Sequence, residues 1–274
     1  MGRNENIAVF EDTRIWCKND PELVGAINRS NQQQQLVLES DTVKLIPPRY
    51  AEPAQVIVSG RRSLEAAQRY PEYKTCVLNF ASATNPGGGV VWGSTAQEEC
   101  LCRCSTLYAN LTDYPLWTPF YDAHRRQHNP LYNDDCIYTP DVVVFKTDTV
   151  NPAPMNKADW WKVNIITCAA PNLRPDRDGR YNFYVDDMKL HQIHVKRMRR
   201  ILSIAAANGN EAVILGAYGC GAFRNPPGIV AAALKQVADE FRYHFRVIEF
   251  AVYCSPRDEL NYKTFRRVFS IVKG

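Results

Sequence analysis

Long hydrophobic runs are absent from this sequence. None approaches the roughly 18 apolar residues that a membrane-spanning helix needs. The first residues, MGRNENIAVFEDTR, contain no apolar segment behind a basic flank, so they do not resemble a secretory signal. Internal repeats and low-complexity linkers are also missing. We therefore expect a protein with no membrane association, located in the cytoplasm, or in the nucleus if its source is eukaryotic.

Strong charge of either sign is also lacking. The formal net charge is only +4, and no long basic tract or nucleic-acid-binding signature is present. This balance disfavours a nucleic-acid-binding module but permits an anionic ligand. The only crowding of basic residues, at residues 196–200, is interpreted as a solvated helix face.

The nine cysteines do not form a recognisable framework. Their number is odd and their spacing matches no disulfide scaffold, so reduced thiols are expected. Cys100, Cys102 and Cys104 alternate along one segment, which suggests a metal site at first sight. If that segment is helical, Cys102 points away from the other two, so the three thiols cannot meet at one ion. We expect no metal and no redox cofactor.

Apolar segments rich in β-branched residues alternate with amphipathic helical segments along the chain. Several of these strand-like segments are continuously apolar, which is typical of strands buried on both faces of a sheet. The pattern predicts a three-layer α/β/α fold with a mixed, mostly parallel central sheet. Strands are expected at residues 35–40, 42–46, 54–60, 75–82, 141–147, 162–170, 212–219 and 247–253, and helices at Ser63–Arg69, Ser94–Leu111, Asp186–Asn208, Pro227–Phe245 and Arg257–Ile271.

Two parts of the chain stand outside this alternation. Residues 1–34 are predicted to form a helical extension packed on the core, and residues 35–274 one larger domain. The segment Thr112–Pro140 is rich in Pro, Tyr, Asn and Asp. Its composition favours a long surface excursion, of the kind that can serve as a lid.

Glycines gather at two junctions where an apolar strand leads into a helix. We call them the first glycine loop, Asn85–Gly89, and the second glycine loop, Gly216–Phe223. Backbone N–H groups in such loops can hold phosphate, although tight turning alone would also explain the glycines. No GK[ST] follows either loop, which excludes a P-loop nucleotide hydrolase. Asn225, after the second loop, is expected to cap the next helix.

Two adjacent acids, Glu98 and Glu99, follow the first glycine loop. Ser94 and Gln97 match a capping box, with Ser94 as the N-cap residue. The acids then lie about 100° apart around the helix, too divergent for the facing carboxylates of an ordinary glycosidase. One of them can be a catalytic acid. The alternative is a solvated first turn in which Glu99 pairs with Arg103.

The two loops together resemble a known family. NFASATNPGGG, followed by seven residues and QEE, is similar to the signature of bacterial-type poly(ADP-ribose) glycohydrolases, which are catalytic macrodomains, and GAYGCGAFRN is similar to their second loop. The resemblance extends from about Leu36 to Phe269 and is weakest in the N-terminal helices and in Thr112–Pro140. It implies a macrodomain that cleaves ribose–ribose bonds of poly(ADP-ribose) without a cofactor.

The resemblance also implies roles for individual residues. Glu99 matches the family's general acid and base, and Glu98 matches its partner that binds the substrate riboses. The residues that would bind ADP-ribose are Asn85, Gly87, Gly88, Gly89, Gln97, Gly219, Cys220, Gly221, Ala222 and Phe223. From the sequence alone, Phe223 could equally be a core residue, and Asn85 could simply begin a turn.

Two other functions remain open at this point. A non-catalytic ADP-ribose reader would not need the acid, so the presence of Glu98 and Glu99 argues against it. An enzyme of the same fold that removes single ADP-ribose units would keep it, and the sequence does not distinguish that enzyme from a polymer hydrolase. The expected partners are poly(ADP-ribose) or ADP-ribosylated macromolecules, with ADP-ribose as product, and a monomer is expected.

Overall fold

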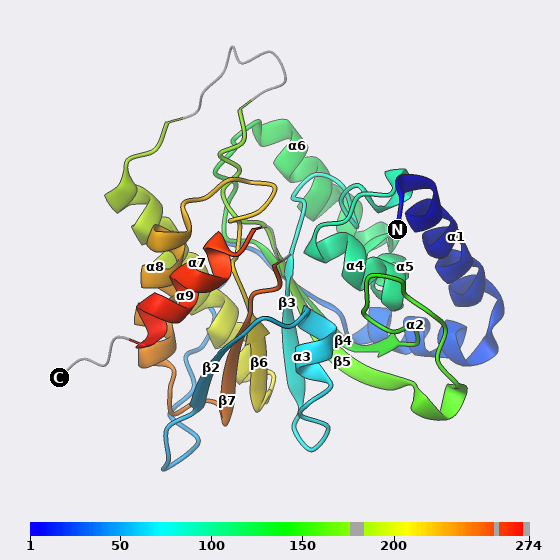
Figure 1. The fold of residues 1–274 in the computed structure, drawn as a ribbon, viewed down its shortest axis with the longest axis horizontal. Coiled ribbons are helices and arrows are strands. Elements are labelled where there is room, and N and C mark those ends of the chain that lie inside the picture. The colour runs from blue at the N-terminus through cyan, green and yellow to red at the C-terminus, as the bar shows by residue number, and fades with distance from the viewer. Residues whose placement is uncertain (176–183, 255–257, 271–274) are drawn as a thin grey trace. The chain divides into compact units, whose positions relative to one another are not determined.

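The computed structural model describes residues 1–175, 184–254 and 258–270. Its strands form a mixed seven-stranded sheet, which confirms the predicted α/β class (Figure 1). In order across the sheet the strands are β1 (Gln35–Val37), β4 (Cys136–Val144), β5 (Trp161–Cys168), β3 (Thr75–Phe80), β6 (Ala212–Leu215), β7 (Val247–Ala251) and β2 (Gln55–Ser59).

The chain divides into two compact units. Unit 1 contains Met1–Glu39, Asn79–His128 and Asp135–Ala169, and unit 2 contains Ser40–Leu78, Asn129–Asp134 and Ala170–Gly274. Strand β3 passes from unit 2 into unit 1, because its last two residues, Asn79 and Phe80, belong to unit 1. The predicted division at residue 34 stays a prediction.

Unit 1 combines the antiparallel strands with the N-terminal helices. β4 pairs with β1 on one edge and with β5 on the other, both antiparallel. Helices α1 (Arg3–Asn19) and α2 (Pro21–Gln33) meet at Asp20, whose carboxylate accepts from the N–H groups of Glu22 and Leu23 at the start of α2. α2 packs on β4 through a small apolar core that includes Leu23 and Phe145.

The single helix expected at Ser94–Leu111 is two helices, α4 (Gln97–Cys104) and α5 (Leu107–Leu111). The break occurs because Ser105 adopts an extended conformation and bridges to Val144 at the end of β4. Its hydroxyl donates to Leu101 O and accepts from Leu107 N, so the backbone groups freed by the break are still bonded.

The surface excursion expected at Thr112–Pro140 is mostly regular structure. It contains η2 (Tyr114–Leu116), η3 (Trp117–Asp122), α6 (Ala123–Gln127) and the start of β4. Phe120 and Tyr121 are fully buried. These two aromatic side chains pack into unit 1, whereas Tyr114 is 83% exposed. Two further short helices, η1 (Val90–Trp92) and η4 (Lys157–Asp159), also belong to unit 1.

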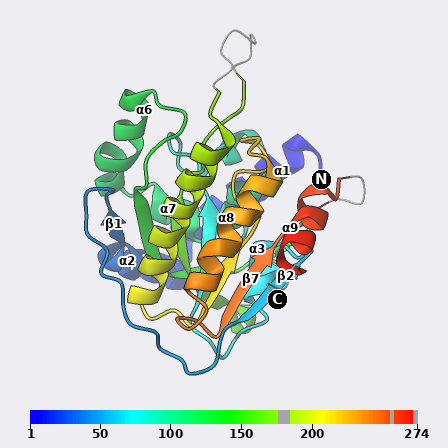
Figure 2. The ribbon, with the colours of Figure 1, turned by 90° about the vertical axis from the view of Figure 1, so that its left-hand side faces the viewer.

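Unit 2 is built on parallel strands, with β6 paired to β3 and β7, and β7 paired to β2. Its helices are α3 (Ser63–Ala67), α7 (Asp187–Ala207), α8 (Pro227–Glu240) and α9 (Leu260–Ser270). The crossover β6–α8–β7 runs toward β2, whereas β2–α3–β3 runs the opposite way. Because both crossovers should be right-handed, α8 and α3 cover opposite faces of these strands. α7 lies beside α8 (Figure 2).

Some predicted element bounds are wrong. Residues 42–46 form no strand, because Leu45 is 61% exposed and two prolines follow, so nothing covers or continues the segment. α8 ends at Glu240, five residues earlier than expected. α9 spans Leu260–Ser270, and both expected ends of this helix, Arg257 and Ile271, lie outside the described residues. In the described part of the chain, no helix is both long and apolar enough to cross a membrane.

Candidate active site

The end of β3 and the start of α4 are joined by side chains of unit 1. Gln97 Oε1 accepts from the N–H of Phe80 at 2.9 Å. The predicted capping box is wrong, because α4 begins at Gln97 with Ala96 as its N-cap residue and no side-chain cap. Ser94 instead closes the turn after the glycines: its N–H donates to Gly89 O, and its carbonyl accepts from Arg103 Nη1.

Glu98 lies in the first turn of α4 and is only 3% exposed. Its Oε1 accepts from Asn79 Nδ2 at 3.2 Å and its Oε2 from Ser82 N at 2.8 Å. Burial, together with the like charge of Glu99, raises the pKa of Glu98 to about 8, against the opposing effect of the Ser82, Asn79 and Gly87 donors. The protonated form of Glu98 is therefore favoured well above the pH range in which an exposed glutamic acid loses its proton.

Glu99 is 7% exposed, and its two oxygens differ. Oε1 accepts from Gly89 N at 2.8 Å, whereas Oε2 is buried and has no hydrogen-bond partner. The alternative of a solvated first turn is wrong for both acids. Arg103 does not pair with Glu99, because its guanidinium donates to Ser94 O and Cys100 Sγ. A buried, unpartnered carboxylate oxygen is costly unless a ligand completes it.

The missing side chains of the first glycine loop make room for these carboxylates. At Gly88, whose φ is +59°, an added Cβ would lie 2.6 Å from Glu99 Oε1 and 2.9 Å from Glu98 Oε2. Gly87 also has positive φ, and its added Cβ would lie 2.7 Å from the Tyr108 ring. Only glycine satisfies both the backbone conformation and the close approach.

Asn85 begins the turn and leaves its side chain exposed. Its backbone N–H donates to Ser82 Oγ at 3.1 Å and its carbonyl accepts from Gly88 N at 2.9 Å. The side-chain amide donates to Thr84 Oγ1 at 3.3 Å. The turn-forming interpretation of Asn85 is thus correct, and the exposed amide oxygen leaves a ligand role open.

Helix α1 holds the segment after the loop, which the sequence analysis missed. Arg3 Nε donates to Trp92 O at 2.8 Å. The next residue, Gly93, has φ +75°, and an added Cβ there would collide with Arg3 O. Farther along α1, Thr13 Oγ1 donates to Arg103 O at 2.6 Å in a buried bond. Gly93 is the only residue of this segment that indicates an unusual backbone conformation in the sequence. A glycine does not reveal that its partner lies on α1, far away in the chain.

The second glycine loop, in unit 2, is organised by Asn225. Gly219 has φ +78°, and its added Cβ would lie 2.7 Å from Ala170 Cβ. Asn225 is buried and does not cap α8, whose N-cap residue is Pro226. Its Nδ2 instead donates to Pro171 O, Gly219 O and Phe223 O, because a buried amide needs hydrogen-bond partners within the protein.

His194, which received no role from the sequence, completes this network. Because three carbonyls fix the nitrogen of the Asn225 amide, Asn225 Oδ1 faces His194 Nε2, 2.9 Å away, and Nε2 must carry the proton. Burial lowers the pKa of His194 to about 4, so the ring is neutral at physiological pH. Nothing in the spacing of an α7 histidine indicates this contact.

The remaining predicted residues of the second loop lie near its surface. Gly221 and Ala222 are exposed, and Phe223 is half-buried, with its ring centroid 6.2 Å from that of Tyr132. Burial raises the pKa of the Cys220 thiol to about 12, so it stays protonated. In the described residues, no group of three or more His, Cys, Asp or Glu side chains is arranged to hold a metal ion.

Comparisons with known proteins identify a family whose match includes the first glycine loop and both acids. The family model of the catalytic domain of microbial-type PARG, poly(ADP-ribose) glycohydrolase, matches residues 6–147. The match includes most of α1 and all of α2. A search of curated proteins finds no match.

Solved structures of the same enzyme type match nearly the whole chain. The glycohydrolase from Thermomonospora curvata is 28% identical with a TM-score of 0.84, and the alignment covers 97% of this chain and 100% of that one. A structure of the same enzyme with the inhibitor ADP-HPD is 26% identical over 97% of this chain and 99% of that one, with a TM-score of 0.81. The Deinococcus radiodurans enzyme in complex with ADP-ribose is 34% identical over 89% of this chain and 97% of that one, with a TM-score of 0.76.

Proposed function

Because the chain belongs to the family of microbial-type poly(ADP-ribose) glycohydrolase catalytic domains, we propose that it hydrolyses the ribose–ribose O-glycosidic bonds of poly(ADP-ribose) and releases ADP-ribose. The observation that carries this proposal is Glu99. Its Oε1 is fixed by Gly89 N–H and its Oε2 is buried without a partner. A carboxyl group that is held in place through Oε1, with Oε2 available to bond to a substrate, suits proton transfer to that substrate.

Glu99 performs both proton transfers in this mechanism. As an acid it donates its proton to the leaving ribose hydroxyl while the glycosidic bond breaks and an oxocarbenium-like centre develops. As a carboxylate it then removes a proton from water, which attacks that centre and completes the hydrolysis. Glu98 is not free to act as a second catalytic carboxylate, because both of its oxygens already accept hydrogen bonds from the protein. One carboxylate therefore makes both proton transfers.

Glu98 supports Glu99 through charge and position. Burial raises the pKa of Glu98, which favours its protonated form and so reduces the negative charge beside Glu99. The Asn79 and Ser82 bonds keep Glu98 at the end of β3 throughout.

The glycine loops supply the ligand contacts in this proposal. Because Gly87, Gly88 and Gly89 carry no side chains, a phosphate or ribose can approach their backbone closely, and Asn85 offers an exposed amide. The N–H groups of Gly88 and Gly89 already donate to Asn85 O and Glu99 Oε1, so they hold the shape of the loop. Gln97 supports the site indirectly. Its Oε1 accepts a hydrogen bond from Phe80 N and so holds the start of α4 against the end of β3. For the second loop we propose ligand contacts from Gly219, Cys220, Gly221, Ala222 and Phe223. Glu98, Glu99 and the first loop come from one chain, in keeping with an active monomer.

Incubation with purified poly(ADP-ribose), with free ADP-ribose followed by chromatography, tests the proposal. The wild type and a Glu22→Gln control, which neutralises an exposed acid on α2, should release ADP-ribose at equal rates. Glu99→Gln should release it about 100-fold to 10,000-fold more slowly, the usual contribution of a general acid or base. ADP-ribose binding without release by the wild type would instead indicate a reader, and release only from singly modified protein would indicate a single-unit hydrolase.

A further inference from the structure

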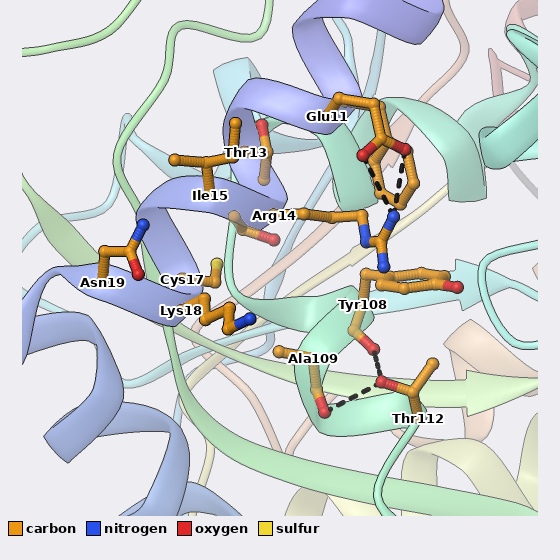
Figure 3. Close-up of a pocket in the computed structure, with 12 residues that line it drawn as sticks. Glu11, Thr13, Arg14, Ile15, Cys17, Lys18, Asn19, Tyr108, Ala109 and Thr112 are labelled. Carbon is orange, nitrogen blue, oxygen red and sulfur yellow. Dashed lines mark hydrogen bonds and ion pairs between the residues drawn. The ribbon is translucent and has the colours of Figure 1, made fainter.

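A pocket lies in unit 1 between α1 and α5, and neither Glu98 nor Glu99 is among its lining residues. Its volume is about 490 Å³, which is within the range of about 300 to 1,000 Å³ seen for small-molecule sites. Figure 3 shows that α1 supplies one wall, with Arg14, Ile15 and Lys18, and that α5 supplies the other, with Tyr108 and Ala109.

The lining of this pocket combines one accessible aromatic ring with positive charge. The ring belongs to Tyr108, which is partly exposed and packs edge to face against the fully buried Phe10 with their centroids 4.8 Å apart. Glu11 is neutralised by Arg14, whose Nη1 lies 3.0 Å from the carboxylate. Within the described chain, Lys18 has no carboxylate within ion-pair distance, so the pocket keeps one uncompensated positive charge.

Tyr108 connects this pocket to the first glycine loop. Its ring is part of the pocket lining, and the same ring lies where a side chain at Gly87 would be, 2.7 Å from an added Cβ. If a ligand in the pocket displaces the Tyr108 ring, the ring presses on Gly87, because closely packed groups leave no empty space between them. The pocket and the loop that holds Glu99 share one rigid aromatic contact.

We propose that the pocket between α1 and α5 binds a planar, ring-bearing anion the size of a nucleoside monophosphate, and that Tyr108 transmits its binding to the first glycine loop. The ring packs on the aromatic and aliphatic lining, and the anionic group pairs with Lys18 and with the outer face of Arg14. Such a ligand acts as an effector, and by thermodynamic reciprocity ADP-ribose binding at the loop changes its affinity by the same factor.

The test uses adenosine 5′-monophosphate as the probe and amide NMR shifts of Ala109 and Thr112, two residues that line the pocket. The shifts at these two positions are compared with those of a variant whose pocket is filled, so that binding at the glycine loops is not mistaken for binding in this pocket. Saturable shifts are expected with the monophosphate, and at least about tenfold weaker binding with adenosine or with ribose 5-phosphate, each of which lacks one of the two required groups. The readout is independent of turnover, so it stands or fails separately from the proposed function.

Two variants decide whether the probe binds in this pocket. Ala109→Trp fills the space and should abolish the shifts at Thr112, and Lys18→Glu should weaken binding at least about tenfold. Lys44→Glu makes the same charge change at an exposed position outside the pocket and should leave binding unaltered. No saturable shift in the wild type overturns the proposal, as does unchanged affinity in Ala109→Trp.

Discussion

Replacing Gly88 by alanine tests whether the glycine is there to make room for the catalytic carboxylates. The added Cβ would lie 2.6 Å from Glu99 Oε1, and an ordinary contact begins at 3.4 Å, so the carboxylate must move by about 0.8 Å. Misplacement of about 1 Å can cost about 100-fold in rate. The positive φ of Gly88 adds about 1 to 2 kcal/mol of strain in the folded state.

Gly209→Ala is the matched control, because it separates strain from displacement. Gly209 has φ +73°, but an added Cβ there meets nothing within 4 Å. Gly209→Ala should lower the free energy of unfolding in urea by about 1 to 2 kcal/mol, and Gly88→Ala by at least as much, because its Cβ also meets both carboxylates. Only Gly88→Ala should lower kcat on poly(ADP-ribose), by about 100-fold. Equal kcat in the two variants would refute the reasoning that Gly88 positions Glu99.

Further predictions concern the buried polar groups. Glu98→Gln should flatten the pH dependence of stability. The pKa of Glu98 is raised to about 8 in the folded state, against 4.5 unperturbed, so its contribution to stability is fully present below about pH 4.5. That contribution is lost as the pH rises toward 8. Urea unfolding at pH 5 and pH 8 checks this, and an equal decrease in both proteins would contradict it. Asn225→Ala should lower the free energy of unfolding by about 3 kcal/mol at pH 7, because it leaves His194 Nε2 and Pro171 O without a partner, whereas Gly228→Ala should change little. The carbonyls of Gly219 and Phe223 keep the backbone N–H groups of Asn225 and Leu173. Thr13→Val should cost about 1 to 2 kcal/mol by removing the buried bond to Arg103 O, and a variant as stable as the wild type would argue against α1 as a support of α4.

The sheet could be predicted from the sequence because its strands are buried and continuously apolar. Residues 75–82 and 247–253 gave β3 and β7 directly. Residues 42–46 have a similar composition but nothing to pack against, and composition does not contain that information. The split between α4 and α5 escaped prediction for a related reason, since the bridge from Ser105 to Val144 joins segments far apart in the chain.

The candidate site was only partly predictable. The glycines and the two acids stand close together in the sequence, so their association could be inferred from spacing. The burial of Glu98 could not, because it depends on Asn79 and Ser82 at the end of β3. Serine and asparagine are common helix-capping residues, but Ser94 and Asn225 hold turns together instead. Groups distant in the chain, such as the Arg103 guanidinium, bond to the polar groups that would otherwise cap a helix.

The most direct test of the central claim separates binding from chemistry in Glu99→Gln. Calorimetry gives the ADP-ribose dissociation constant, and a single-turnover assay gives the rate of ADP-ribose release from poly(ADP-ribose). Because the substituted amide side chain keeps an oxygen for Gly89 N–H, the account predicts a dissociation constant within about threefold of the wild type and a release rate at least about 100-fold lower. A release rate within about threefold of the wild type would contradict the assignment of Glu99 as the acid and base.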